Sequence, residues 1–199
     1  DPNEIDAPRI DALAAAGMNR ASIGVQDFDP DIQQIIGRVQ SYEVTRDAVE
    51  GLRAAGIHSL NADILFGLPD QTQARLSDSV QMLLSLSPDR VALYGYAHVP
   101  WMAKRQALIP TEALPSPEQR LALFETARQL FIWDDYAEIG IDHFARPGDS
   151  MARAARTGHL RRNFQGYTDD TCDVLTGLGA SATSRLPQGF AQNARSTAA

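Results

Sequence analysis

Polar side chains that could bind a small molecule fall at or near the ends of three predicted strands. Gln26 and Asp27 end the first strand, Asp63 lies in a second strand that stops at Gly67, and Ala97 ends the third. Because the carboxyl ends of parallel strands meet at one edge of a sheet, these residues are expected to surround one opening. An amide, a carboxylate and a small residue with accessible backbone can hold a polar ligand. Taken singly, each residue could equally cap a loop or satisfy backbone at a strand end.

Positive charge is concentrated in one part of an acidic chain. The net charge is -7 and the sequence pI about 5.0, which argues against nucleic-acid and anionic-membrane partners. Residues 143–163 nevertheless hold five arginines against Asp149 alone, a local charge of about +4. This window predicts an anion site, although a solvated helix face would explain most of its arginines as well.

The sequence lacks the motifs of several common enzyme classes. The sequence contains no Ser-His-Asp elbow, no H-E-x-x-H and no P-loop. Its single cysteine, Cys172, can form neither an internal disulfide nor an iron–sulfur site within this chain. No apolar run approaches the roughly 20 residues of a membrane helix. The chain starts at Asp1 without a leader, so we expect it to be a piece of a longer protein.

Strands and helices alternate along the first two thirds of the 199 residues. Helix signals include Gly17 as a stop, Asp29-Pro30 as a start, and a Ser116–Gln119 capping box before an apolar stripe. The pattern predicts strands at 20–25, 59–66 and 90–97, and helices at 6–16, 29–37, 45–55, 72–86 and 116–131.

The strand spacing predicts an α/β fold with a parallel sheet. Successive strands start 30 to 40 residues apart, the length of a right-handed βαβ crossover. Three such strands make an open sheet or the second half of a barrel, and the abrupt start favours the half barrel. From about residue 140 the pattern loosens. We therefore expect a half-barrel unit at 1–139 and the start of a smaller, substrate-side cap at 140–199.

Five segments together resemble a known family. They are NRASIGVQDF at 19–28, DILFGLP at 63–69, YAHVP at 96–100, DHFARP at 142–147 and NFQGYT at 163–168. In this order they resemble oxygen-independent coproporphyrinogen III oxidase, a radical S-adenosylmethionine (SAM) enzyme. The first three segments also resemble related heme chaperones, whereas the last two resemble the oxidase only.

The resemblance implies a partial barrel of six βα units, with a 4Fe-4S cluster held by three cysteines on a loop and SAM beside it. A 5'-deoxyadenosyl radical would take hydrogen from two propionates of coproporphyrinogen III, which lose carbon dioxide and become the vinyl groups of protoporphyrinogen IX. It also implies a cytoplasmic enzyme of heme biosynthesis with an electron donor for the cluster. This chain would lack the cysteine motif and the C-terminal helices, so it is expected to be inactive alone.

Transferred residue by residue, the resemblance assigns binding roles and no bond-breaking or metal-ligating residue. It implies SAM contacts at Gln26, Arg38, Asp63 and Ala97, with Thr183 near a second SAM molecule. Arg146 is the candidate for the substrate carboxylates, because a planar guanidinium suits a carboxylate.

A heme chaperone on the same scaffold is the alternative function. It would bind and transfer heme rather than convert a porphyrinogen. Such a protein needs an axial heme ligand, and the candidates are His58, His98, His143 and His159.

Overall fold

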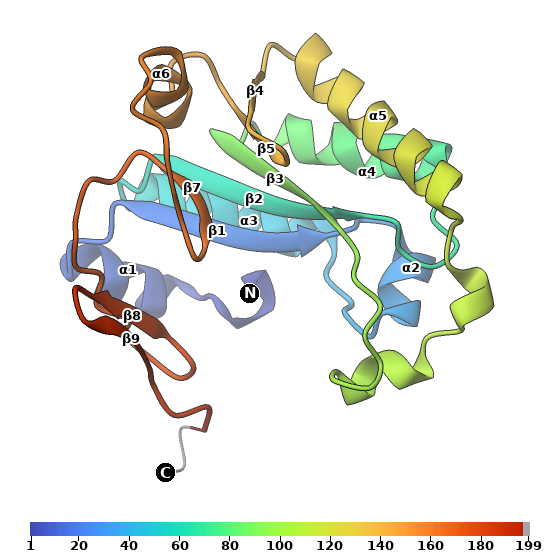
Figure 1. Cartoon of the computed structure of the whole chain (residues 1–199), viewed down its shortest axis with the longest axis horizontal. Coiled ribbons are helices and arrows are strands. Elements are labelled where there is room, and N and C mark those ends of the chain that lie inside the picture. The colour runs from blue at the N-terminus through green and yellow to red at the C-terminus, as the bar shows by residue number, and fades with distance from the viewer. Residues whose placement is uncertain (197–199) are drawn as a thin grey trace.

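A computed structural model of the chain describes residues 1–196 as a mixed sheet with helices on one face (Figure 1). The α-helices are α1 (Ala7–Ala15), α2 (Pro30–Ile35), α3 (Tyr42–Ala54), α4 (Gln73–Ser85), α5 (Pro117–Trp133) and α6 (Ser150–Arg156). The strands are β1 (Arg20–Gln26), β2 (Ser59–Phe66), β3 (Arg90–Gly95), β4 (Ala137–Ile139), β5 (His143–Ala145), β6 (Arg161–Asn163), β7 (Gly166–Thr168), β8 (Thr183–Leu186) and β9 (Gly189–Gln192). No helix among these residues is long and apolar enough to cross a membrane.

Two of the helix-start signals predicted from the sequence cap helices in the structure. Asp29 caps α2 through the backbone amides of residues 31 and 32, with proline at the first helical position. Ser116 and Gln119 form the reciprocal capping box of α5. Helix α3 begins earlier than predicted, at Tyr42, because the Ser41 side chain accepts a hydrogen bond from the amide of Val44.

The five-stranded sheet has the order β1-β2-β3-β5-β4. The pairs β1–β2 and β2–β3 are parallel, which confirms the prediction for the first three strands. The expectation of an entirely parallel sheet is wrong beyond β3, since β5 pairs with β3 and β4 in antiparallel fashion. The sheet therefore continues across residue 139, where the sequence suggested a boundary. Two separate hairpins, β6–β7 and β8–β9, follow.

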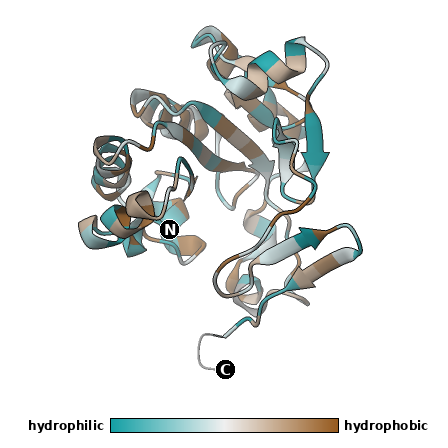
Figure 2. Cartoon of the chain, turned by 90° about the vertical axis from the view of Figure 1, so that its left-hand side faces the viewer, coloured by the Kyte–Doolittle hydropathy of each residue, from teal (hydrophilic) through white to brown (hydrophobic). Residues whose placement is uncertain are grey.

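The two faces of the sheet differ in polarity. Leu60, Ala62 and Ile64 of β2 and Val91 and Leu93 of β3 are buried in the main core, which includes residues of α3, α4 and α5. Figure 2 shows the resulting bands of hydrophobic and hydrophilic residues along the strands. The alternating residues point to the other face, which carries the polar side chains considered next.

Candidate functional site

The polar face of the sheet carries a hollow of about 380 Å³. Its lining includes Ser22 of β1, Asn61 and Asp63 of β2, Tyr94 of β3 and His143 of β5. Alternation along each strand brings these side chains to the face opposite the helices. Residues from four strands thus meet at one polar surface.

Strand register arranges part of this surface as a row. Gly24 pairs with Asp63, Asp63 with Ala92, and Ala92 with His143. Neighbouring strands lie about 4.8 Å apart, so the row runs straight across the sheet. We call Gly24, Asp63, Ala92 and His143 the cross-strand row.

Asp63 is the acidic centre of the row. Asn61 Nδ2 donates to Asp63 Oδ1 at 2.7 Å, and Ser22 Oγ donates to Oδ2 at 3.4 Å. Burial raises the pKa of Asp63, while these hydrogen bonds and the charges of His143 and Arg38 oppose the rise. The carboxylate keeps accepting capacity for a ligand's hydroxyl or amino hydrogens.

Gln26 and Arg38 converge on Gly24 at the carboxyl end of β1. Arg38 Nη2 donates to the Gly24 carbonyl at 3.0 Å and lies 3.4 Å from Asp1 Oδ2. A Cβ atom at Gly24 would come within 2.7 Å of Gln26 Nε2 and 3.1 Å of Arg38 Nη2. A larger residue here would require the Gln26 and Arg38 side chains to move. The structure therefore brings three of the predicted SAM contacts, Gln26, Arg38 and Asp63, together around one backbone position.

The donors at this position suit the amino-acid and ribose parts of SAM. The Arg38 side chain is partly exposed, and its buried Nε has no hydrogen-bond partner, so the guanidinium keeps unused donor capacity beside Gly24 that suits a carboxylate. The Gln26 amide offers both a donor and an acceptor. Among the described residues, no group of three or more His, Cys, Asp or Glu could hold a metal ion.

Gln26 has an unusual backbone conformation. Its φ is 70°, in the left-handed region, and the β1–β2 register shifts between Gly24 and Gln26. The bulge takes the chain out of the strand and turns the next residue, Asp27, away from solvent. The sequence placed Asp27 at the opening of the site with Gln26, whereas the structure buries it completely.

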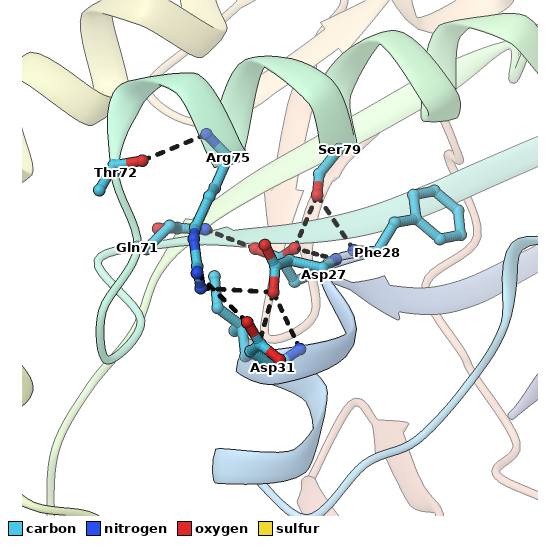
Figure 3. Close-up of polar contacts among 9 residues, drawn as sticks. Asp27, Phe28, Asp31, Gln71, Thr72, Arg75 and Ser79 are labelled. Atoms are coloured by element: carbon cyan, nitrogen blue, oxygen red, sulfur yellow. Dashed lines mark hydrogen bonds and ion pairs between the residues drawn. The ribbon is translucent and has the colours of Figure 1, made fainter.

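Asp27 is the centre of a hydrogen-bond network that joins separate elements (Figure 3). Its Oδ1 accepts from Ser79 Oγ of α4 at 2.6 Å and from the Asp29 amide at 2.7 Å. Its Oδ2 accepts from Gln71 Nε2 at 2.7 Å. Gln71 Oε1 in turn accepts from the Gly67 amide at 2.7 Å. Asp27 thus fixes the loop after β1 against the loop after β2, and both loops border the carboxyl edge.

The conformation of Gln26 predicts a difference between two substitutions that both remove its side chain. A left-handed non-glycine residue costs about 1–2 kcal/mol, so Gln26→Gly should be more stable than Gln26→Ala by about 1 kcal/mol. Urea unfolding of the chain measures this difference. Equal stabilities would show that the backbone at this position is not strained.

The remaining predicted residues do not belong to the group around Gly24. Ala97 follows β3 at the same edge as Gln26, and its carbonyl accepts from Gln106 Nε2 at 3.1 Å. Thr183 belongs to the β8–β9 hairpin, which lies apart from the carboxyl edge (Figure 1). Its contact with a second SAM molecule stays a prediction.

Arg146 lies at the opposite, amino edge of the sheet. Its amide donates to the carbonyl of Asp89, the residue before β3, at 2.9 Å. Its guanidinium lies 4.7 Å from the Tyr136 ring centroid and 3.5 Å from Asp134 Oδ2. The structure does not bring Arg146 to the polar face, and its role in substrate binding stays a prediction.

Sequence reasoning did not assign Tyr94, Asp142 or the burial of Asp27. Tyr94 follows Ala92 at strand spacing, so alternation in β3 would have placed it on the polar face. Asp142 was named only within the segment at 142–147, and His143 only there and as a candidate heme ligand. The partners of Asp27 lie 44 and 52 residues away in the sequence, at Gln71 and Ser79, and no local signal links them.

Comparison with known proteins agrees with this architecture. A family model described as "Radical SAM superfamily" matches residues 2–83. The chain is 72% identical over 199 residues to "Oxygen-independent coproporphyrinogen III oxidase" of Paracoccus denitrificans, covering 100% of this chain and 44% of that protein. It is 40% identical over 193 residues to the protein of the same name from Escherichia coli, covering 97% of this chain and 42% of that protein.

A solved structure shows the same relationship. "Coproporphyrinogen III oxidase (HemN) from Escherichia coli is a Radical SAM enzyme" superposes with a TM-score of 0.90 at 39% identity, covering 98% of this chain and 45% of that one. In fold and in sequence the chain is similar to radical SAM proteins. It is similar over almost its whole length to proteins named as oxygen-independent coproporphyrinogen III oxidases, which confirms the resemblance seen in the five segments. The chain spans about 44% of the length of the relative from Paracoccus.

Proposed function

We propose that the whole protein converts two propionates of coproporphyrinogen III into vinyl groups with loss of carbon dioxide, giving protoporphyrinogen IX. The observation that carries this proposal is 72% identity over all 199 residues to a protein named for that activity. The relatives named above are oxidases, and they give no support to the heme-chaperone alternative. The proposal includes an electron donor for the cluster and a cytoplasmic setting for the reaction.

The strands fit the second half of a partial β/α barrel, with the polar face turned toward its interior. Three parallel strands, covered by helices on one face and polar on the other, support this arrangement. A 4Fe-4S cluster needs thiolate ligands beyond the one exposed cysteine here, Cys172. We place the cluster ligands outside this chain and expect the chain alone to be inactive.

Gln26, Arg38, Asp63 and Ala97 would hold SAM at the carboxyl edge. SAM bound to a reduced cluster supplies the radical that removes hydrogen from the propionate. The residues of this chain would bind and orient SAM: Arg38 would pair with a carboxylate, Asp63 would accept hydroxyl or amino hydrogens, and Ala97 would offer its backbone. In such enzymes the protein positions the reactive atom and the cofactor performs the difficult step.

The test is a turnover assay on the whole protein with its cluster reconstituted. Anaerobic incubation with coproporphyrinogen III, SAM and a reductant should release carbon dioxide and form protoporphyrinogen IX. Omitting SAM should abolish both products. A protein that carries an intact cluster and gains a heme Soret band, yet releases no carbon dioxide, would contradict the proposal and support the chaperone.

A further inference from the structure

Two buried glutamines lie close to Arg38, the predicted SAM contact at the carboxyl end of β1. Gln33 of α2 is 4% exposed, and Gln40, in the segment between α2 and α3, is 1% exposed. A buried amide side chain must form hydrogen bonds to offset the loss of water. The partners of these two amides therefore show what they hold in place.

Gln33 holds the backbone at Arg38 and at Gln40. Its own carbonyl accepts from the Arg38 amide at 2.9 Å. Its side-chain Nε2 donates to the Gln40 carbonyl at 2.6 Å, and its Oε1 accepts from the Gln40 amide at 3.0 Å. The same Nε2 donates to the carbonyl of Asp27 at 2.8 Å. The segment that carries Arg38 is thus tied to the residue that follows Gln26.

The Gln40 side chain reaches the same backbone atom as the Arg38 guanidinium. Gln40 Nε2 donates to the Gly24 carbonyl at 3.2 Å and to Thr45 Oγ1 at 2.9 Å, which uses both of its hydrogens. Arg38 Nη2 donates to the Gly24 carbonyl at 3.0 Å. Gln40 Oε1 is buried without a partner among the described residues, so the contacts of Nε2 orient this amide. Two side chains therefore converge on one carbonyl oxygen, and each limits where the other can lie.

These contacts form a closed ring that includes the Arg38 side chain. The ring runs from the Arg38 amide to Gln33, on to the backbone of Gln40, and through the Gly24 carbonyl back to the guanidinium. Fixing a flexible side chain before the ligand arrives lowers the entropy cost of binding. The contacts of the guanidinium with Gly24 and Asp1 both use Nη2, so among the described residues Nη1 has no partner. The ring thus holds a guanidinium that still has a donor to offer.

We propose that Gln33 and Gln40 are positioning residues of the SAM site, which hold the Arg38 guanidinium in the orientation that binds the carboxylate of SAM. This inference rests on the proposed function for the identity of the ligand. It adds two residues that neither the rule of strand ends nor the resemblance selected. Both glutamines act through Arg38 and touch no ligand. Their effect on SAM binding must therefore disappear when Arg38 is absent.

The experiment is a double-mutant cycle on the whole protein with its cluster reconstituted, in which calorimetry measures SAM affinity. Gln40→Met keeps the length of the side chain and removes both donated hydrogen bonds, while the backbone contacts with Gln33 remain. We expect this variant to bind SAM about three- to tenfold more weakly, the size of a single lost hydrogen bond. In an Arg38→Ala background, the same substitution should change SAM affinity by less than about twofold, because the group that it positions is gone.

Two further variants separate positioning from general damage. Thr45→Val preserves shape and removes one of the two acceptors of Gln40 Nε2, so it should weaken SAM binding about two- to threefold, and only while Arg38 is present. Gln73→Met is the matched control, because Gln73 Nε2 likewise donates to a threonine hydroxyl, Thr126 Oγ1, at 2.9 Å, between α4 and α5. It should bind SAM normally. In turnover, Gln40→Met should raise KM for SAM and leave kcat at saturating SAM unchanged.

The outcomes distinguish this inference from the proposed function. Normal SAM affinity in Gln40→Met, or an equal loss of affinity with and without Arg38, would overturn the positioning role. Normal SAM affinity in Arg38→Ala would overturn it as well, since nothing would then need positioning. In each case the proposed function stands if the unaltered protein decarboxylates coproporphyrinogen III, and it fails if the unaltered protein binds SAM without decarboxylation. Thr45→Val allows the same comparison where Gln40→Met does not fold.

Discussion

Replacing Arg38 by alanine should weaken binding of SAM to the whole protein by about 1.5–3 kcal/mol, the range for a hydrogen bond to a charged group. Arg38 is fixed by its bond to the Gly24 carbonyl, and its buried Nε has no partner in the protein. Its guanidinium is therefore already oriented before the ligand arrives. Equilibrium dialysis or calorimetry with SAM measures the loss.

Cluster content provides the internal control for this prediction. Iron and sulfide content should be unchanged in Arg38→Ala, because the residue is not a metal ligand. Arg53→Ala serves as the matched variant, since Arg53 donates to the Ser87 carbonyl on the outer, helical side of the sheet. Asp63→Asn should also weaken SAM binding. Unaltered SAM affinity in both Arg38→Ala and Asp63→Asn would show that these residues have structural roles only.

Replacing Asp27 by asparagine should destabilise the chain by about 1–3 kcal/mol. The substitution preserves shape, and its remaining oxygen can still accept from Ser79 and the Asp29 amide. The new amide nitrogen, however, would face the nitrogen of Gln71, and two donors cannot bond. Gln71 cannot simply rotate, because its oxygen already accepts from the Gly67 amide. Urea unfolding measures the loss.

The effect of Asp27 should depend on pH in a defined direction. Burial raises the pKa of Asp27, so the folded chain binds this proton more tightly than the unfolded chain does. Its contribution to stability is then present below the unfolded pKa of about 4 and is lost as pH rises through the folded pKa. The stability difference between the unaltered chain and Asp27→Asn should narrow over that rise.

Asp31→Asn, in the first turn of α2, is the control for Asp27→Asn. The Asp31 carboxylate is exposed and pairs with Arg75 at 3.2 Å, and surface pairs of this kind contribute little. Its substitution should change stability by less than about 1 kcal/mol. A stability difference between the unaltered chain and Asp27→Asn that widens with rising pH would contradict the assigned origin of the pKa change.

Local signals predicted most of the first half of the fold. The predicted strand at 59–66 has the bounds of β2, and the capping box places the start of α5, because both features depend on neighbouring residues. Strands β4 and β5 were not predicted. Each has three residues, too few for alternation to be recognised, and their place in the sheet depends on pairing with β3.

In the candidate site, too, features set by neighbouring residues were predicted and features set by distant residues were not. The rule that ligands bind at strand ends predicted that Gln26 and Asp63 would lie together, and the structure confirms their proximity through Gly24. It could not show that Asp27 turns inward, since this depends on a positive φ at Gln26 and on distant partners. The arginine count selected Arg146 but could not place it, because charge along a sequence says little about which edge of a sheet a side chain occupies; the role of Arg146 in substrate binding stays a prediction.

The change of strand direction at β3 also limits how this sheet can be extended. Antiparallel β5 occupies the outer edge of β3, and short β4 ends that side. A further parallel strand with a right-handed crossover could therefore be added only beside β1. Among the described residues, the free edge of β1 carries unpaired backbone groups in the spacing that an incoming strand recognises. A separate peptide with such a strand could thus assemble onto this chain by complementation, and the sheet would grow in one direction only.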